Sequence, residues 1–302
     1  MKVMVTGATG FIGKELIKRL NEMGHEIAVL TRNRDSAKFR IPVHCEIITW
    51  DPCRNHLPST VLKGVDAVIN LAGENIADRR WSPERKRELI QSRELSVRRL
   101  VNAMTYMDKK PKTLVSVSAI GFYGDRGDLI LNETDLKGHG FLSDVCKVWE
   151  EEILKVKEFG VRTVAYRLGM VLGHDGGALN KILPPFKLGL GGNLGSGSQW
   201  MSWIHINDLV NMLVHAIEDP SIDGIYNAVS PNAVRNKEFT KTLGNILKRP
   251  TIFTVPKFVL KVVLGELSEL LLGSQRVNAK KISDTGFKFK YPHIQEALKE
   301  VC

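Results

Sequence analysis

Three glycines near the N-terminus have the spacing of a phosphate-binding turn. The stretch Thr6-Gly7-Ala8-Thr9-Gly10-Phe11-Ile12-Gly13 follows an apolar segment directly and opens a segment with helical periodicity. A turn in that position points backbone N–H groups at a diphosphate. Gly7 would permit the tight turn, Gly10 the approach of the pyrophosphate, and Gly13 close packing of helix on strand. The sequence therefore predicts a dinucleotide site, whose contacts we assign to Gly7, Thr9, Gly10, Phe11, Ile12 and Gly13.

The residues after the second apolar segment indicate which dinucleotide binds. An NAD site usually has an acid there, which accepts hydrogen bonds from the adenosine ribose. This chain has Thr31-Arg32 instead, and an arginine offers a bidentate partner to a 2′-phosphate. Asp51, after the third apolar segment, suits the edge of the adenine. The alternative for Arg32 is a solvated basic loop. We predict NADP(H) as the cofactor, with Thr31, Arg32 and Asp51 among its contacts.

The elements that must position these residues alternate between strand and helix, as in a parallel sheet. Apolar runs predict strands at 2–6, 27–30, 46–50, 66–71, 113–118 and 163–168. Helical periodicity predicts helices at 11–23, 83–107 and 141–159. The predicted fold class is therefore α/β, a Rossmann-type doubly wound parallel sheet with a smaller C-terminal substrate or cap region.

Beyond Gly169 the pattern changes to short elements separated by glycine-rich segments. We expect helices at 208–218 and 236–247 and a strand at 225–229. An apolar helix at 258–272 is interpreted as core, with a dimer face as the alternative. The stretch 191–197 is interpreted as a lid over the substrate or a plain surface loop. The predicted division is a dinucleotide-binding domain at 1–248 and a small C-terminal domain at 249–302.

Composition narrows the classes of partner. The chain has 302 residues and a net charge of +10, which favours anionic ligands. Its basic residues are dispersed and accompany no nucleic-acid-binding motif, so we expect no nucleic acid partner. Four cysteines without a C-x-x-C pair predict a reducing compartment and no metal site. Without a signal peptide or membrane span, we expect a cytoplasmic protein with a small-molecule substrate, able to form a homodimer.

Several stretches together resemble a known superfamily. They are Asn70-Leu71-Ala72-Gly73-Glu74, Arg80-Trp81, Ser116-Val117-Ser118, Arg167-Leu168-Gly169 and Trp203-Ile204-His205. With the glycine turn, they resemble the extended short-chain dehydrogenases/reductases, in the atypical branch named for sugar-nucleotide epimerases. The C-terminal block is similar to that branch's small C-terminal domain. The resemblance implies further cofactor contacts from Leu71, Ala72, Gly73, Glu74, Arg80 and Lys147.

The resemblance also implies a catalytic set of serine followed by Tyr-x-x-x-Lys on the next helix. Ser118 matches the serine. Lys147 can take the lysine position, which puts Ser143 where the tyrosine belongs. The neighbouring register gives Leu142 and Cys146 instead. Neither register supplies the tyrosine, and a positioned proton donor changes a rate by roughly 10²–10⁴.

Other polar residues could replace the missing tyrosine. Tyr123, five residues after Ser118, is the first candidate for a substitute acid, with packing as the alternative. Glu74 and Arg80 are further candidates facing the cofactor, with a surface ion pair as the alternative. His205 is interpreted as structural rather than catalytic. The candidate catalytic residues are thus Ser118, Lys147 and Tyr123.

These observations predict an NADP(H)-dependent oxidoreductase or nucleotide-sugar-epimerase-like enzyme of unknown substrate, with non-standard catalytic residues. The alternative is an NADP(H)-binding regulatory or sensor protein with little or no catalysis.

Overall fold

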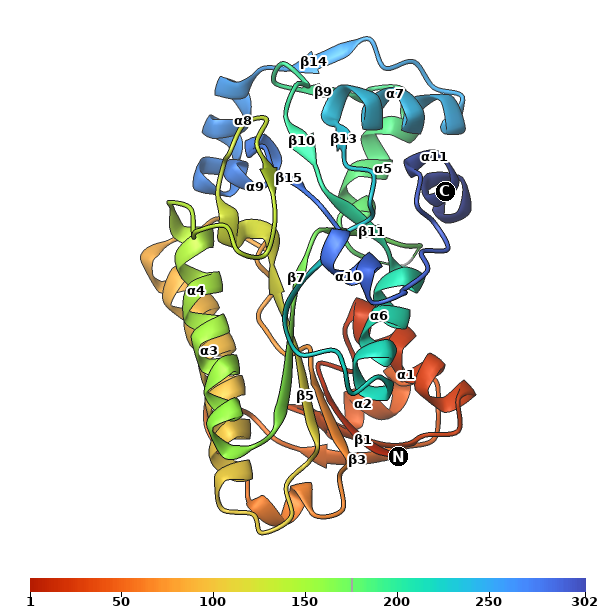
Figure 1. Cartoon of the computed structure of the whole chain (residues 1–302). Helices are drawn as coiled ribbons and strands as arrows, with labels where there is room; N and C mark the ends of the chain where they lie inside the picture. The colour runs from red at the N-terminus through yellow and green to blue at the C-terminus, as the bar shows by residue number, and fades with distance from the viewer. Residues whose placement is uncertain (175) are drawn as a thin grey trace.

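A seven-stranded parallel sheet forms the centre of the molecule in the computed structural model, which describes residues 1–174 and 176–302 (Figure 1). In spatial order its strands are β12 (Gly224–Ala228), β7 (Arg162–Leu168), β5 (Thr113–Ala119), β4 (Ala67–Asn70), β1 (Lys2–Thr6), β2 (Glu26–Thr31) and β3 (Glu46–Thr49). The chain runs outward in one direction from β1 to β3 and in the other from β4 to β12. Ligands of such sheets bind at the carboxyl ends of the strands where the order reverses, here between β1 and β4.

Helices cover both faces of the sheet, as the alternating pattern predicts (Figure 1). One face carries α3 (Pro83–Thr105) and α4 (Phe141–Leu154), which pack against each other, and the other carries α1 (Phe11–Glu22) and α6 (Ile206–Glu218). The helix α2 (Arg34–Arg40) follows β2. Short 3₁₀ turns lie at η1 (Ser59–Leu62), η2 (Ile120–Tyr123) and η3 (Lys155–Phe159), and a further one, η4 (Gly265–Ser268), lies near the C-terminus. The Rossmann-type doubly wound sheet is thereby confirmed.

A second layer of short elements lies beyond the carboxyl edge of the sheet (Figure 1). Its strands form pairs: β8 (Met170–Leu172) with β11 (Trp203–His205), β9 (Gly192–Leu194) with β14 (Phe253–Val255), β10 (Trp200–Met201) with β13 (Val234–Arg235), and β6 (Ile130–Leu131) with β15 (Arg276–Val277). Its helices are α5 (Leu179–Lys187), α7 (Asn236–Leu247), α8 (Lys257–Leu264), α9 (Glu269–Leu272), α10 (Lys280–Asp284) and α11 (Ile294–Val301).

A second hydrophobic core holds this layer together. Trp203 and Phe239 are buried in it, and α11 contributes Ile294, Leu298 and Val301. The C-terminal helix therefore packs on elements from the region 170–247 rather than on a core of its own.

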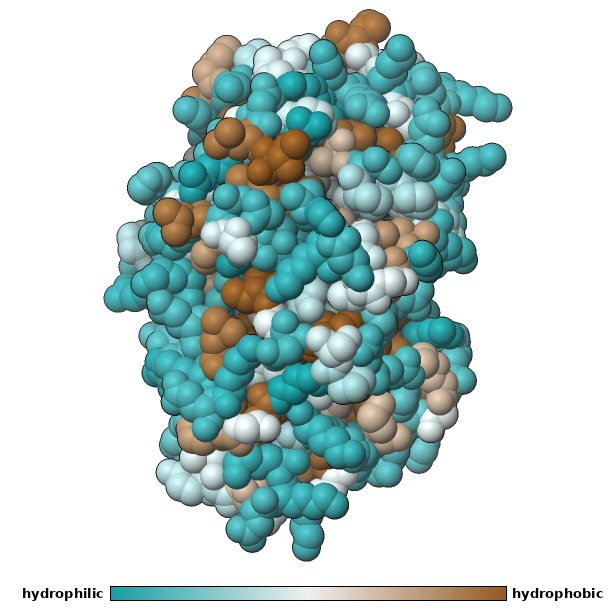
Figure 2. Space-filling view, in the orientation of Figure 1, coloured by the Kyte–Doolittle hydropathy of each residue, from teal (hydrophilic) through white to brown (hydrophobic). Residues whose placement is uncertain are grey.

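The apolar segment 258–272 differs from its predicted form. The helix α8 ends before Gly265, whose φ of 61° is left-handed, and η4 and α9 follow. Phe258 and Val262 are 69% and 72% exposed, so the interpretation of this segment as a core helix is wrong. Figure 2 shows apolar surface in the upper left of the molecule, where α8 lies in Figure 1.

None of the described helices combines the length and apolarity needed to cross a bilayer.

The stretch 191–197 also contains a strand that the sequence does not predict. Residues 192–194 form β9, and a Cβ on Gly192 would lie 2.0 Å from the carbonyl oxygen of Phe253. Glycine is required there because the two backbones pack directly against each other. Three of the seven residues in this segment therefore form a paired strand.

Candidate cofactor and active site

The glycine turn between β1 and α1 has the geometry that its sequence predicts. Gly7 has a φ of 70°, and a Cβ there would lie 2.7 Å from the carbonyl group of Leu71. A Cβ on Gly13 would lie 2.3 Å from the carbonyl oxygen of Gly7. Gly7 thus permits the turn and Gly13 the close packing of helix on strand.

Gly10 sits at the open end of this turn. It is the N-cap of α1, and no side chain caps the helix there. The first amides of a helix have no partner within it, so an uncapped glycine leaves a positive, unobstructed helix end. Phe11 and Ile12 begin the helix, and a Cβ on Gly176 would meet the ring of Phe11 at 2.4 Å. The start of α1 therefore packs against the segment after β8.

A row of buried polar side chains fixes the loop after β4. Thr6 Oγ1 donates to Asn70 Oδ1 at 2.6 Å and accepts from the Ala72 amide at 3.2 Å. Asn70 Nδ2 donates to Ser116 Oγ at 3.1 Å. These bonds link β1, β4 and β5 at their carboxyl ends. They hold Leu71 and Ala72 beside Gly7, whereas Gly73 lies next to the side chain of Arg93.

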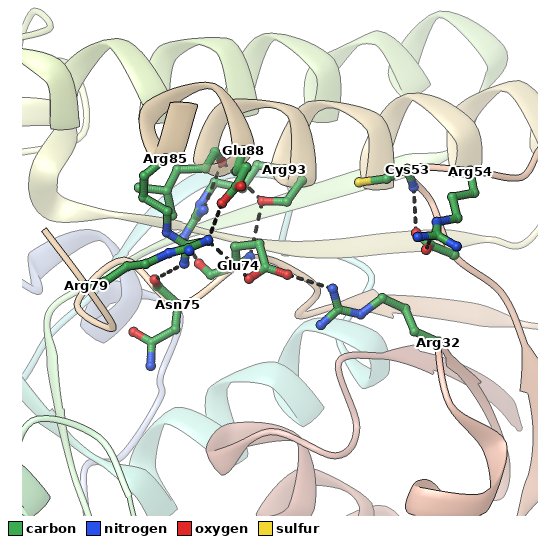
Figure 3. A network of polar contacts seen from close by, with 12 residues as sticks. Arg32, Cys53, Arg54, Glu74, Asn75, Arg79, Arg85, Glu88 and Arg93 are labelled. Atoms are coloured by element: carbon green, nitrogen blue, oxygen red, sulfur yellow. Dashed lines mark hydrogen bonds and ion pairs between the residues drawn. The ribbon is translucent and has the colours of Figure 1, made fainter. Parts of the chain in front are cut away.

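Arg32 and Glu74 meet across this edge of the sheet (Figure 3). Arg32 Nη1 donates to Glu74 Oε1 at 2.6 Å, and the two side chains are 66% and 29% exposed. The second carboxylate oxygen of Glu74 lies 3.4 Å from Nη1 of Arg85, a buried arginine that also pairs with Glu88. The predicted NADP determinant therefore sits at the end of β2, paired with an acid.

Positive neighbours decide the charge of Glu74. Burial on its own would raise the pKa of this carboxyl group, but the hydrogen bonds and charges of Arg32 and Arg85 outweigh it and leave the pKa below its ordinary value. Glu74 is thus an anion at neutral pH. It is a poor proton donor.

The remaining predicted cofactor contacts are dispersed. Thr9 is half-buried in the glycine turn, and Thr31 ends β2. Asp51 follows β3, where its carboxylate accepts from the Cys53 amide at 2.9 Å. Arg80 donates to the carbonyl oxygens of Val262 and Val263 at the end of α8. Arg80 therefore joins the loop after β4 to the C-terminal layer, and its contact with the cofactor stays a prediction.

The Ser118 side chain contacts a buried ion pair between Glu150 and Arg167. It is only 2% exposed, and its hydroxyl donates to Glu150 Oε1 at 2.8 Å. Arg167, on β7, donates to both oxygens of Glu150 at 2.9 and 2.8 Å. A bidentate pair with an added hydroxyl donor satisfies a buried carboxylate well. Glu150 and Arg167 are not among the predicted site residues, although an arginine within the apolar run TVAYRL is a signal of a buried partner.

Tyr123 belongs to the same network. It is fully buried, its hydroxyl accepts from Arg167 Nη1 at 2.9 Å, and it donates to Asn227 Oδ1 at 2.7 Å. Burial raises the pKa of Tyr123 to about 12, against the lowering influence of Arg167 and Asn227. The geometry favours packing over the predicted role of a substitute acid.

The structure does not bring Lys147 to Ser118. The Lys147 side chain is 55% exposed and pairs with Glu151 at 3.1 Å. Ser143 is buried and donates to the carbonyl oxygen of Gly121 at 2.9 Å. The register Leu142–Cys146 faces the end of β5 instead, and burial raises the pKa of the Cys146 thiol to about 11. The predicted placement of Lys147 beside Ser118 is therefore wrong, because the Lys147 side chain points from α4 into solvent.

His205 has the structural role that its sequence context predicts. It caps α6, since its Nδ1 accepts from the Asn207 amide at 3.1 Å. Its Nε2 lies 2.7 Å from Glu300 Oε2, and its ring stacks on Tyr291 with centroids 3.9 Å apart. The histidine thus ties α6 to α11.

Comparison with known proteins agrees with this arrangement. The model of the NAD dependent epimerase/dehydratase family matches residues 3–228, and that of a domain of unknown function, DUF1731, matches residues 255–301. The epimerase family protein SDR39U1 homolog of Arabidopsis thaliana is 40% identical, over 100% of this chain and 86% of its own length. The human epimerase family protein SDR39U1 is 36% identical, over 100% and 99%.

Solved structures show the same relationship. The structure of human SDR39U1 with NADPH superposes with a TM-score of 0.88 at 35% identity, covering 100% of this chain and 99% of that one. A UDP-glucuronic acid 4-epimerase of Bacillus cereus has a TM-score of 0.81 at 17% identity, covering 100% and 98%, and shares the fold. From the family match over most of its length and from these relatives, the chain belongs to the NAD dependent epimerase/dehydratase family.

Proposed function

We propose that this protein is an NADP(H)-dependent oxidoreductase or epimerase-like enzyme acting on a small molecule of unknown identity. The observation that carries the proposal is the glycine turn at an uncapped helix end, with Arg32 at the end of the neighbouring strand. That combination offers N–H groups to a diphosphate and a guanidinium to a 2′-phosphate.

The choice of NADP(H) over NAD(H) rests on two supports. Arg32 stands where NAD-binding domains usually have an acid, and most of its side chain is open to a ligand. Human SDR39U1, which is 35% identical, was solved with NADPH.

The chemistry that the cofactor supplies is hydride transfer at the nicotinamide. Near the end of β5, this chain has a buried group of hydrogen-bonded polar side chains, made up of Ser118, Glu150 and Arg167. A proton donor is harder to assign, since Tyr123 is buried with a raised pKa and Glu74 is held as an anion. We propose that the proton comes from water or from the substrate, with slow turnover of a narrow set of substrates.

Cofactor titration tests the first part of the proposal. NADPH should bind at least about tenfold more tightly than NADH, because a hydrogen bond to a charged group contributes about 1.5–3 kcal/mol. Arg32→Ala should remove most of that preference. Arg34→Ala, at an exposed position two residues away, is the matched control and should retain it. Equal affinities, or tighter NADH, would contradict the proposal.

A screen of carbonyl compounds and nucleotide sugars with NADPH and NADP⁺ tests the second part. Turnover in the unmodified protein that persists in Tyr123→Phe and Glu74→Gln would agree with a proton from water or substrate. Tight cofactor binding without any turnover would instead favour a regulatory or sensor protein.

The compartment is part of the same proposal. Cys45, Cys53, Cys146 and Cys302 are all free thiols, which suits a reducing compartment such as the cytoplasm.

A further inference from the structure

The ion pair of Arg32 and Glu74 spans the place where the cofactor must lie. In the sheet, β1 lies between β2 and β4, with Thr6 level with Leu30 on one side and Asn70 on the other. Arg32 follows β2 and Glu74 follows β4, so a bond between them crosses the carboxyl end of β1. The glycine turn begins at that end, with Gly7 directly after Thr6. The dinucleotide crevice of this fold runs along this edge.

The two members of the pair are held very differently. The backbone of Glu74 is held by two hydrogen bonds. Its N–H donates to Ser92 Oγ at 3.2 Å, and its carbonyl oxygen accepts from Arg93 Nη2 at 3.0 Å. Its carboxylate is also near the buried Arg85. Among residues 1–174 and 176–302, the Arg32 guanidinium has Glu74 as its only hydrogen-bond partner. Arg32 is therefore the less constrained partner, with a single contact drawn to its guanidinium in Figure 3.

A 2′-phosphate and the Glu74 carboxylate offer the same chemistry to Arg32. Both are anions that a guanidinium can bind in a bidentate manner. A ligand with a free 2′-hydroxyl carries no charge to replace the carboxylate, so Arg32 can remain on Glu74 while it binds. A 2′-phosphorylated ligand must take Arg32 from Glu74, and the cost of that exchange falls on this ligand alone.

Resting on the proposed binding of NADP(H), we infer that Glu74 is a specificity-determining residue that competes with the adenosine 2′-phosphate for Arg32. Glu74 lowers the preference for NADP(H) below what Arg32 could otherwise provide. Loss of this acid should therefore sharpen the selectivity for the phosphorylated cofactor.

The test measures dissociation constants of four probes: NADP⁺, NAD⁺, 2′,5′-ADP and 5′-AMP. In Glu74→Gln the ratios Kd(NAD⁺)/Kd(NADP⁺) and Kd(5′-AMP)/Kd(2′,5′-ADP) should rise about two- to fivefold, as expected for an ion pair of this exposure. The ratio matters because loss of a nearby negative charge would favour the diphosphate of both dinucleotides equally. The matched control is Glu88→Gln, which removes the other acid on Arg85 and should leave the ratios unchanged.

A double variant separates competition from a general electrostatic change. In the Arg32→Ala background, Glu74→Gln should no longer alter the ratios. If Glu74→Gln unfolds at a lower temperature, Glu74→Asp provides a second route, since it keeps a negative charge at position 74 but shortens its reach toward Arg32, which contacts the end of the Glu74 side chain at 2.6 Å. It should raise the ratios in the same direction.

The outcomes are distinguishable from a failure of the proposed function. If the unmodified protein binds neither dinucleotide, the proposed function and this inference fall together. If it binds NADP⁺ but the ratios stay the same or decrease in both Glu74 variants, only the inference is overturned. Weaker binding of all four probes would show that Glu74 contacts the ligand itself, which also overturns it.

Discussion

At the level of single residues, the position of Lys147 on the exposed face of α4 separates it from Ser118, the residue beside which the sequence predicts it. Within the described residues, its exposed side chain pairs only with Glu151, and exposed pairs four residues apart contribute roughly 0.3–0.5 kcal/mol. We therefore expect Lys147→Ala to leave the Kd of NADPH within about twofold and to lower the free energy of unfolding by at most about 0.5 kcal/mol. Cofactor titration and urea unfolding measure the two quantities. A tenfold loss of NADPH affinity would restore Lys147 to the site.

The sequence left two registers open on α4, and the reason is geometric. Successive residues on a helix point about 100° apart, so Ser143–Lys147 and Leu142–Cys146 differ only in which face meets the sheet. Glu150 lies one turn beyond Cys146, and its buried partner Arg167 fixes that face. The glycine turn needed no such tertiary information, because its roles follow from local spacing.

At the level of elements, the glycine turn allows fold and binding to be separated. Among the atoms that the structure describes, a Cβ on Gly10 meets only the Gly7 carbonyl oxygen at 3.1 Å, whereas one on Gly13 lies within 2.8 Å of three backbone atoms. We expect Gly10→Val to remain folded but to lose NADPH binding at least tenfold, because the side chain occupies the pyrophosphate position.

Gly13→Val is the matched comparison. It should lose cofactor binding together with stability, by about 1–3 kcal/mol or more, because backbone atoms must move. Thermal unfolding and NADPH titration of both variants check this. If Gly10→Val binds normally, the dinucleotide lies elsewhere.

The contact between α6 and α11 predicts a pH dependence of stability. Burial lowers the pKa of His205 even though Glu300 opposes the shift. The folded state then binds fewer protons than the unfolded state, so the stability from this group is present above about pH 6.5 and is lost as the pH falls. His205→Gln should reduce the decrease in unfolding free energy between pH 7 and pH 5, measured by urea unfolding. An unchanged decrease would mean that other groups dominate.

The sequence predicts strands correctly where an apolar run is several residues long. The six strands of the sheet taken from continuous apolar runs all form, and 225–229 supplies the seventh. The strands β8 to β11 have two or three residues each, too few for a periodic pattern. The helix α2 was missed although Asn33 caps it by accepting from the Ser36 amide at 2.9 Å, a local signal that sequence reasoning could have used.

At the level of the whole molecule, the second core connects regions that the sequence assigned to two domains. The family models also leave a gap between 228 and 255, while α11 packs against α7. The division at 248 stays a prediction, and so does the homodimer, for which the exposed apolar residues of α8 offer a surface.

Leu298 tests how far the molecule depends on this core. It is fully buried on α11, and leucine-to-alanine changes in cores cost about 2–5 kcal/mol. Leu298→Ala should lower the free energy of unfolding by that amount, whereas the exposed neighbour Lys299→Ala should change it by less than about 0.5 kcal/mol. A small effect at Leu298 would contradict the dependence of the molecule on this core.

The late arrival of α11 in the second core has a consequence for biosynthesis. Trp203 and Phe239 leave the ribosome well before the residues of α11 that cover them. Until then, we expect the apolar side chains of the second core to lack the cover that α11 provides in the folded protein. Such surfaces expose incomplete chains to aggregation and are bound by chaperones. Translation that stalls between α7 and α11 should therefore yield chains that depend on chaperones to stay dispersed, even with the dinucleotide half already folded.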